Sequence, residues 1–225
     1  MFKYLSLVVL GFCLALTLFT ERGKPGIELL PNLPKTQSML PNEEVVFPAI
    51  IRLINKDNDF QCTAVVFDTQ YAATAAHCLT DENGDLSKEP FTIYDSSGTN
   101  TKVKALAAGL NRRMDYGIVK GNFTKFRLAK IDTYRNGFLF GNLFITCGFP
   151  YGNRYINCSP FKPIKNYVFH VVGIGSLFPG MSGGPVIDTA TGVVVGVNSA
   201  APGDLTEVVP LIGLLAAFGI EPELK

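Results

Sequence analysis

The feature that most restricts the fold of this chain is a series of about twelve short apolar runs separated by turn residues. The runs are rich in β-branched and aromatic residues, and Asn, Asp, Gly and Ser interrupt them, which is the pattern of β-strands. The expected strands are residues 49–55, 62–68, 71–76, 91–95, 103–108, 116–120, 139–147, 154–158, 167–172, 185–188, 193–198 and 205–209. Many short strands at near-regular spacing favour β-barrels over parallel βαβ units.

Outside the amino-terminal segment, only residues 210–218 predict a helix, which Pro210 begins and Gly219 ends. The composition of 225 residues, 47% hydrophobic with 22 Gly and 14 Pro, suits one large or two small cores joined by many turns. The net charge is +1, and the charged residues form no basic stripe. We therefore expect an all-β globular protein with no nucleic-acid partner.

Residues 4–20 contain no charge and follow Lys3. This apolar run is longer than most signal-peptide cores and slightly short for a spanning helix, so segment 1–20 predicts an uncleaved membrane anchor, with a cleaved export signal as the alternative. Cys13 follows Phe12 rather than a small residue, which favours an apolar role over lipidation. Lys3 and the amino terminus are expected to stay in the cytoplasm, so the rest of the chain is predicted to be extracytoplasmic.

Four prolines interrupt residues 21–46. This composition predicts an extended tether, and a removable pro-segment is the alternative. The remaining residues, 47–225, form the expected folded domain.

Four cysteines lie outside the apolar segment: Cys62, Cys78, Cys147 and Cys158. An even number in an exported chain favours disulfides over metal ligands, and only two histidines are present. Cys147 and Cys158 bracket a turn-rich segment between two expected strands, which makes a cross-hairpin disulfide plausible. No metal and no cofactor is predicted.

Ser182 stands in a stretch of three glycines and a proline, residues 180–185. Glycine permits a tight turn and a close approach of substrate. The backbone amides of Gly180 and Ser182 are therefore candidates for an oxyanion hole around an exposed hydroxyl. Without other motifs, the alternative is a plain glycine-rich hairpin turn.

Two upstream residues complete a catalytic pattern. His77 follows the small residues at the end of an expected strand, where an imidazole is well supported as a general base. Asp115 begins an apolar strand, and its carboxylate can orient such an imidazole. Asp95 and Asp132 are other possible acids, but neither precedes an apolar strand of the same form.

In the order His77, Asp115, Ser182, the strings at residues 74–78, 115–119 and 180–185 resemble those of the trypsin/chymotrypsin-like serine peptidases. The resemblance covers about residues 47–218, and the short chain looks closer to compact bacterial or viral members than to digestive enzymes. It implies two six-stranded antiparallel β-barrels, at about 47–121 and 136–209, with the triad in the cleft between them and a carboxy-terminal helix. It also implies a Cys62–Cys78 disulfide beside the histidine.

The resemblance further implies a substrate pocket. Ser176 stands at its base, where trypsin carries an acid, and residues Asn198, Ser199 and Ala200 form the strand that borders it and pairs with substrate backbone. Asn198 stands where glutamate-specific members carry histidine. These uncharged residues favour cleavage after an apolar residue. His170 is a further candidate for the pocket, although a structural role is more common for such a residue.

The sequence therefore predicts a serine endopeptidase acting on a protein or peptide substrate. A catalytically inactive binding protein of the same fold is one alternative, disfavoured because all three triad residues are present. An esterase or acyltransferase with the same triad is the other, disfavoured because no α/β-hydrolase pattern is present.

One departure from the family concerns activation, and it yields a prediction. Zymogen members carry an aspartate immediately before the nucleophile, which binds a newly released amino terminus, whereas this chain has Met181. We expect versions that start at several points between residues 24 and 45 to titrate equally with a fluorophosphonate probe, as the full-length protein does in detergent. Activity that required one defined first residue would contradict this.

Overall fold

The computed structural model describes residues 49–55, 61–81, 83–95, 97–108, 114–132, 138, 141–201 and 205–220. The segments 1–20 and 21–46 lie outside these residues, so the anchor and tether remain predictions. Within the part of the chain that is described, no helix is both long and apolar enough to cross a bilayer.

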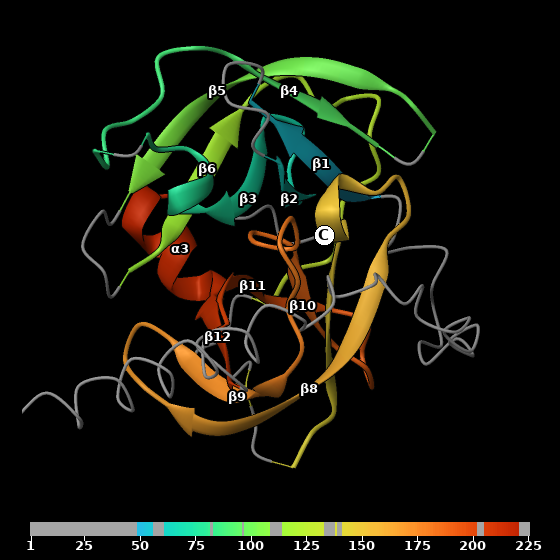
Figure 1. Cartoon of the computed structure of the whole chain (residues 1–225), viewed down its shortest axis with the longest axis vertical. Helices are drawn as coiled ribbons and strands as arrows, with labels where there is room; N and C mark the ends of the chain where they lie inside the picture. The colour runs from blue at the N-terminus through green and yellow to red at the C-terminus, as the bar shows by residue number, and fades with distance from the viewer. Residues whose placement is uncertain are drawn as a thin grey trace, which may run out of the picture. The chain divides into compact units, whose positions relative to one another are not determined.

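The first six strands close into one antiparallel barrel (Figure 1). They are β1 (Ile50–Ile54), β2 (Gln61–Val66), β3 (Tyr71–Ala75), β4 (Phe91–Tyr94), β5 (Asn100–Ala108) and β6 (Tyr116–Lys120). Around the barrel they follow the order β1-β2-β3-β6-β5-β4, and β4 pairs back onto β1. Both faces of β2 and β3 are buried: Ala64 and Val66 pack in the barrel interior, whereas Val65 and Ala73 pack in a cluster shared with the second barrel.

The next six strands close into a second antiparallel barrel. They are β7 (Phe144–Gly148), β8 (Asn157–Asn166), β9 (Val171–Gly175), β10 (Pro185–Asp188), β11 (Val194–Ala200) and β12 (Leu205–Pro210). The order β7-β8-β9-β12-β11-β10 repeats the order of the first barrel. The prediction of two six-stranded antiparallel barrels is therefore confirmed.

The boundaries of β8 and β9 differ from the sequence prediction. Strand β8 continues through Pro160 and Pro163, which a pattern-based reading treats as interruptions, and its register with β9 shifts just after Pro163. Tyr167 and His170 form the turn between the two strands, where the Tyr167 amide donates to the His170 carbonyl at 2.8 Å. Strand β9 consequently begins four residues later than expected.

Each barrel has its own apolar core, and a third cluster lies between them. Phe138, Phe144 and Phe161 pack together in the second barrel, with ring centroids 5.2–6.5 Å apart. The cluster between the barrels combines residues of both, such as Val65 and Val197. Burial of this shared apolar surface holds the two barrels against each other.

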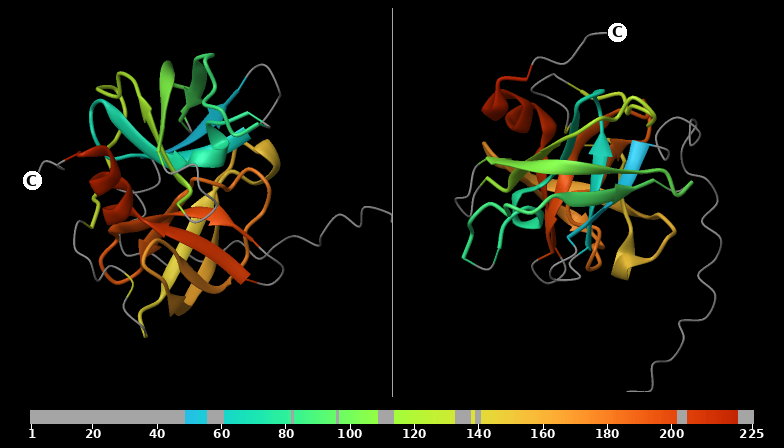
Figure 2. Two further views of the ribbon diagram at one scale, coloured as in Figure 1. Left: turned by 90° about the vertical axis from the view of Figure 1, so that its left-hand side faces the viewer. Right: turned by 90° about the horizontal axis from the view of Figure 1, so that it is seen from above.

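The helix α3 (Leu211–Phe218) packs on both barrels, because it contacts β5 as well as β11 and β12 (Figure 2). Pro210 precedes it, and Gly219 ends it in the left-handed conformation with φ 61°. The amide of Ile220 returns to the Leu215 carbonyl at 3.1 Å, which completes the helix end. The short carboxy-terminal helix is therefore present as predicted.

Gly213 in α3 provides a stability prediction. A Cβ at this position would collide with the hydroxyl of Tyr116, which is buried in β6. Alanine normally stabilises a helix relative to glycine by about 1 kcal/mol. We expect Gly213→Ala instead to destabilise the protein by about 1–3 kcal/mol through overpacking, as measured by urea unfolding.

The background Tyr116→Phe supplies the control for this change, because it removes the colliding hydroxyl. Gly213→Ala should cost less stability in that background. A stabilising effect of Gly213→Ala in the wild-type background would contradict the close contact.

Candidate active site

The pairing of β3 with β6 brings the predicted histidine and aspartate together. Ala75, at the end of β3, pairs with Tyr116, at the start of β6. His77 lies two residues beyond Ala75 in the single-turn 3-10 helix Ala76–Cys78, and Asp115 immediately precedes Tyr116. Both side chains therefore stand at the same end of the first barrel.

The carboxylate of Asp115 accepts three hydrogen bonds. The ring nitrogen Nδ1 of His77 lies 2.7 Å from Oδ2, and the His77 backbone amide donates to Oδ1 at 2.9 Å. The hydroxyl of Ser199, on β11 of the second barrel, donates to Oδ2 at 2.7 Å. Burial raises the pKa of Asp115, but these bonds and the charge of His77 outweigh it, so the pKa lies below its usual value.

Ser182 lies in the loop between β9 and β10, at a turn that only glycines permit. Gly180 and Gly183, on either side of it, have φ of +93° and +78°. A Cβ on Gly180 would collide with the Phe149 carbonyl, and one on Gly183 with Thr74 and the carbonyl of Thr63. Gly183 thus allows the loop to lie directly against the first barrel, and Gly180 allows it to lie against the segment that follows β7.

The amides of Gly180 and Ser182 are predicted to form an oxyanion hole. The orientation of each amide is fixed because the carbonyl of the same peptide unit accepts a hydrogen bond. The Gly180 amide belongs to the unit whose Pro179 carbonyl accepts from the Tyr151 amide at 2.6 Å. The Ser182 amide belongs to the unit whose Met181 carbonyl accepts from Asn198 Nδ2 at 3.2 Å and from the Gly184 amide at 3.0 Å. Because N–H and C=O point in opposite directions in a trans peptide, these contacts fix where both amides point.

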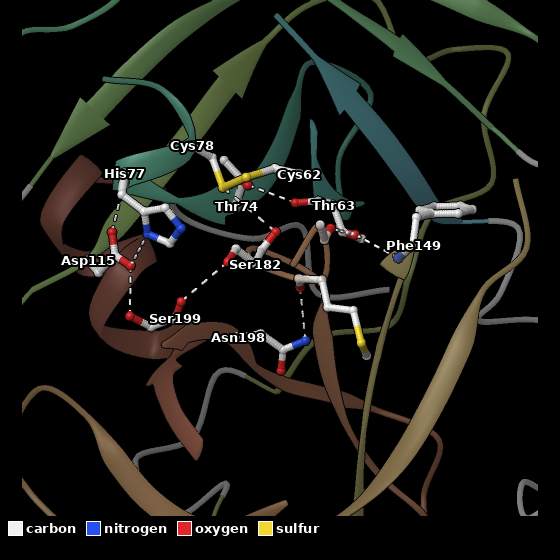
Figure 3. The surroundings of a disulfide bond; sticks show 12 residues. Cys62, Thr63, Thr74, His77, Cys78, Asp115, Phe149, Ser182, Asn198 and Ser199 are labelled. Atoms are coloured by element: carbon white, nitrogen blue, oxygen red, sulfur yellow. Dashed lines mark hydrogen bonds and ion pairs between the residues drawn. A yellow bond between two sulfur atoms is a disulfide. The ribbon is translucent and has the colours of Figure 1, made fainter. Parts of the chain in front are cut away.

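The side chains of His77, Asp115 and Ser182 gather at the junction of the barrels (Figure 3). His77 keeps 41% of its side chain exposed, so the ring is accessible from the solvent. The hydroxyl of Ser182 donates to the Ser199 carbonyl at 3.5 Å. Within the described residues no hydrogen bond joins it to His77, and such contacts are often long before substrate binds.

Two disulfides flank this region. Cys62 is joined to Cys78, the residue after His77, and Cys147 to Cys158 across the β7–β8 hairpin. Among the described residues, the potential metal ligands that cluster are Cys62, His77 and Cys78, within 4.8 Å of one another. Because the two sulfurs are bonded to each other, this cluster offers no thiolates to a metal.

The residues predicted to bind substrate occupy different environments. Asn198 is fully buried, and its side-chain amide donates to the carbonyls of Cys147 and Met181. Ser199 is also buried and turns its hydroxyl to Asp115, while Ala200 is exposed. Ser176 is exposed and lines a pocket of about 590 Å³ that Phe178, Ala201 and Lys162 also border.

Two residues that the sequence left open lie elsewhere. His170 stacks on Tyr167 in the β8–β9 turn, with ring centroids 4.4 Å apart. Asp95 accepts from Ser97 and Thr99 within its own turn, so its carboxylate is engaged locally. The sequence did not predict that the Tyr151 amide and the Asn198 side chain hold the serine loop. Both donate to backbone carbonyls, and such contacts leave no pattern in the sequence.

Two closed barrels of identical strand order, with a histidine and an aspartate on one and a serine loop on the other, define a two-barrel trypsin-like protein. The family model described as trypsin-like peptidase domain matches residues 62–197, more than half of the chain. The protein therefore belongs to this family, and membership supports a peptidase, that is, a hydrolase.

Several proteases are among the solved structures that share this fold. The serine endoprotease from Yersinia pestis matches with TM-score 0.68 and 18% identity, over 81% of this chain and 66% of that one. The HtrA-type protease AlgW with tripeptide matches with TM-score 0.66 and 16% identity, over 81% of this chain and 63% of that one. The Rv3671c protease in its inactive form matches with TM-score 0.62 and 16% identity, over 80% of this chain and 93% of that one. The chain thus spans just under two thirds of the first two, and no curated protein matches it.

The lowered pKa of Asp115 gives a prediction about stability and pH. The carboxylate stabilises the fold above its unfolded pKa of about 3.8, and this contribution is lost as the pH falls through the lower folded pKa. We expect Asp115→Asn to cost about 1–3 kcal/mol at pH 7, because a charged acceptor of three bonds is replaced. The difference from wild type should shrink at pH 3 in urea unfolding; an equal difference at both pH values would contradict it.

Proposed function

We propose that the protein is a serine endopeptidase that hydrolyses peptide bonds with a triad of His77, Asp115 and Ser182. The observation that carries the proposal is the double contact of Asp115 with the ring and the backbone of His77. A carboxylate that accepts from Nδ1–H leaves Nε2 unprotonated and able to act as a base. The family membership and the glycine turn around Ser182 support the same conclusion.

In this mechanism Ser182 Oγ attacks the scissile carbonyl carbon as His77 Nε2 takes the hydroxyl proton. The negative oxygen that forms accepts from the amides of Gly180 and Ser182. His77 then gives the proton to the leaving amine, and an acyl-enzyme remains. Water, deprotonated by the same imidazole, attacks this ester and restores the serine. Asp115 stays ionised throughout and stabilises the imidazolium.

We infer that the residue before the cleaved bond is uncharged and mainly apolar. Ser176 carries no charge, and the side chain of Asn198 is already engaged with two backbone carbonyls. Ala200 is a small residue at the exposed end of β11, where substrate backbone can pair. Solved structures of HtrA-type proteases with bound peptides are consistent with a protein or peptide substrate.

The two disulfides indicate an environment outside the reducing cytoplasm. We propose that the domain works there, either anchored by residues 1–20 or secreted after their removal. The Pro-rich residues 21–46 then act as a tether between membrane and enzyme.

The triad is tested by substitution. Ser182→Ala and His77→Ala should each lower kcat by about 10⁶-fold, because hydroxyl and base act as one unit, and Asp115→Asn by about 10⁴-fold. Turnover of a peptide library by full-length protein in detergent, alongside labelling by a fluorophosphonate, measures both steps. Circular dichroism of each variant controls for folding.

The same assay separates the alternatives. Cleavage by Ser182→Ala at the wild-type rate would refute the assignment. A wild-type protein that binds peptides without labelling or turnover would be an inactive binding protein, and turnover of esters but not peptides would indicate an esterase.

A further inference from the structure

Thr63 is a fully buried threonine of β2 that bonds to two segments distant in sequence. Its hydroxyl accepts from the Phe149 amide at 3.0 Å and donates to the Gly180 carbonyl at 2.7 Å. Its backbone amide donates to the Ser182 carbonyl at 2.8 Å, and its carbonyl accepts from the Thr74 hydroxyl at 2.8 Å. Figure 3 shows Thr63 between the Cys62–Cys78 disulfide and Phe149.

The hydroxyl is not needed to form β2. The strand is otherwise apolar from Cys62 to Val66, and valine would fill the same volume with a higher strand preference. Both hydroxyl partners instead belong to the part of the chain that builds the second barrel and its loops. A threonine in this position therefore serves a contact between the barrels.

The contacts of Thr63 complete a series along the serine loop. The Gly180 carbonyl lies in the peptide unit between the two units that carry the proposed oxyanion-hole amides. Thr63 holds that unit and the Ser182 carbonyl, while Asn198 and Gly184 hold the Met181 carbonyl. Three consecutive carbonyls are thereby fixed, two of them by one residue of the opposite barrel.

We propose that Thr63 is a positioning residue of the reaction. It holds the serine loop, which carries the proposed oxyanion-hole amides of Gly180 and Ser182, against the first barrel. The inference rests on the proposed peptidase function and identifies a determinant of it outside the three motifs. The hydrogen bonds described for Thr63 join it to backbone groups and to the Thr74 hydroxyl, and none of them involves a side chain of the triad. It acts through the Gly180–Met181 peptide unit.

Loss of the hydroxyl leaves the buried Phe149 amide and the partly buried Gly180 carbonyl without their partner. Buried backbone groups recover partners by local movement, and here the movement would rotate the peptide unit between the two amides. Oxyanion stabilisation requires donors 2.7–3.1 Å from the developing charge, so a small rotation weakens it. Ground-state binding along β11 is not affected by this rotation, and kcat should fall with little change in KM.

The test compares Thr63→Val with the conservative Thr63→Ser in the full-length protein. We expect Thr63→Val to lower kcat and the rate of fluorophosphonate labelling by about 10- to 100-fold, with KM within about twofold of wild type. Thr63→Ser retains the hydroxyl and should restore most of kcat. Thr146→Val is the matched control, because Thr146 is also buried and its hydroxyl also donates to a backbone carbonyl, that of Ser159 at 3.3 Å.

The outcomes are distinct. Equal kcat for Thr63→Val and Thr146→Val at matched folded fractions would overturn the inference, as would a loss confined to KM. If Thr63→Val does not fold, Thr63→Ala replaces it, and failure of both to fold would show that the hydroxyl serves the fold as a whole, against the proposal. A wild-type protein without labelling or turnover would refute the peptidase function itself.

Discussion

The structure depends on holding two separately closed barrels in one fixed relative position, because His77 and Asp115 lie on the first barrel and Ser182 lies on the second. Apolar burial between the barrels supplies attraction, but it is non-directional and tolerates sliding. Direction comes from hydrogen bonds that cross the interface, such as Ser199 to Asp115 at 2.7 Å and the Thr63 amide to Ser182 at 2.8 Å. A displacement of either barrel would break these bonds. The bonds therefore hold the two barrels in the one arrangement that brings His77, Asp115 and Ser182 together.

Asp115 shows how a partly buried charge can organise such a junction. Desolvation disfavours an ionised carboxylate, so the fold must surround it with donors. Two donors come from His77 and the third from the opposite barrel. The same bonds orient the imidazole, so the stability of the charge and the alignment of the His77 ring have a common origin. A neutral residue at this position would accept these hydrogen bonds more weakly, and this one contact between the barrels would be weaker.

The sequence predicted the barrels and the three motif residues because both are local patterns: alternating apolar runs, and short strings around His77, Asp115 and Ser182. It misplaced the start of β9 because Pro160 and Pro163 lie inside β8. It did not predict that the hydroxyl of Ser199 contacts Asp115, 84 positions away. Contacts of this kind join residues that lie far apart in the sequence. No periodic pattern of residues indicates them, so they can be identified only from the folded structure.

The way the loop around Ser182 is held also accounts for an uncharged residue at position 181. Met181 is fully buried, and its backbone lies so close to Gly148 that a Cβ there would come within 2.8 Å of the Met181 Cα. A carboxylate in this apolar position would require a cation brought from elsewhere. The loop instead uses uncharged donors, from Tyr151, Thr63 and Asn198, that are part of the two barrels. Because each donor belongs to the described fold, we expect the loop to form together with the barrels, without a separate ionic contact.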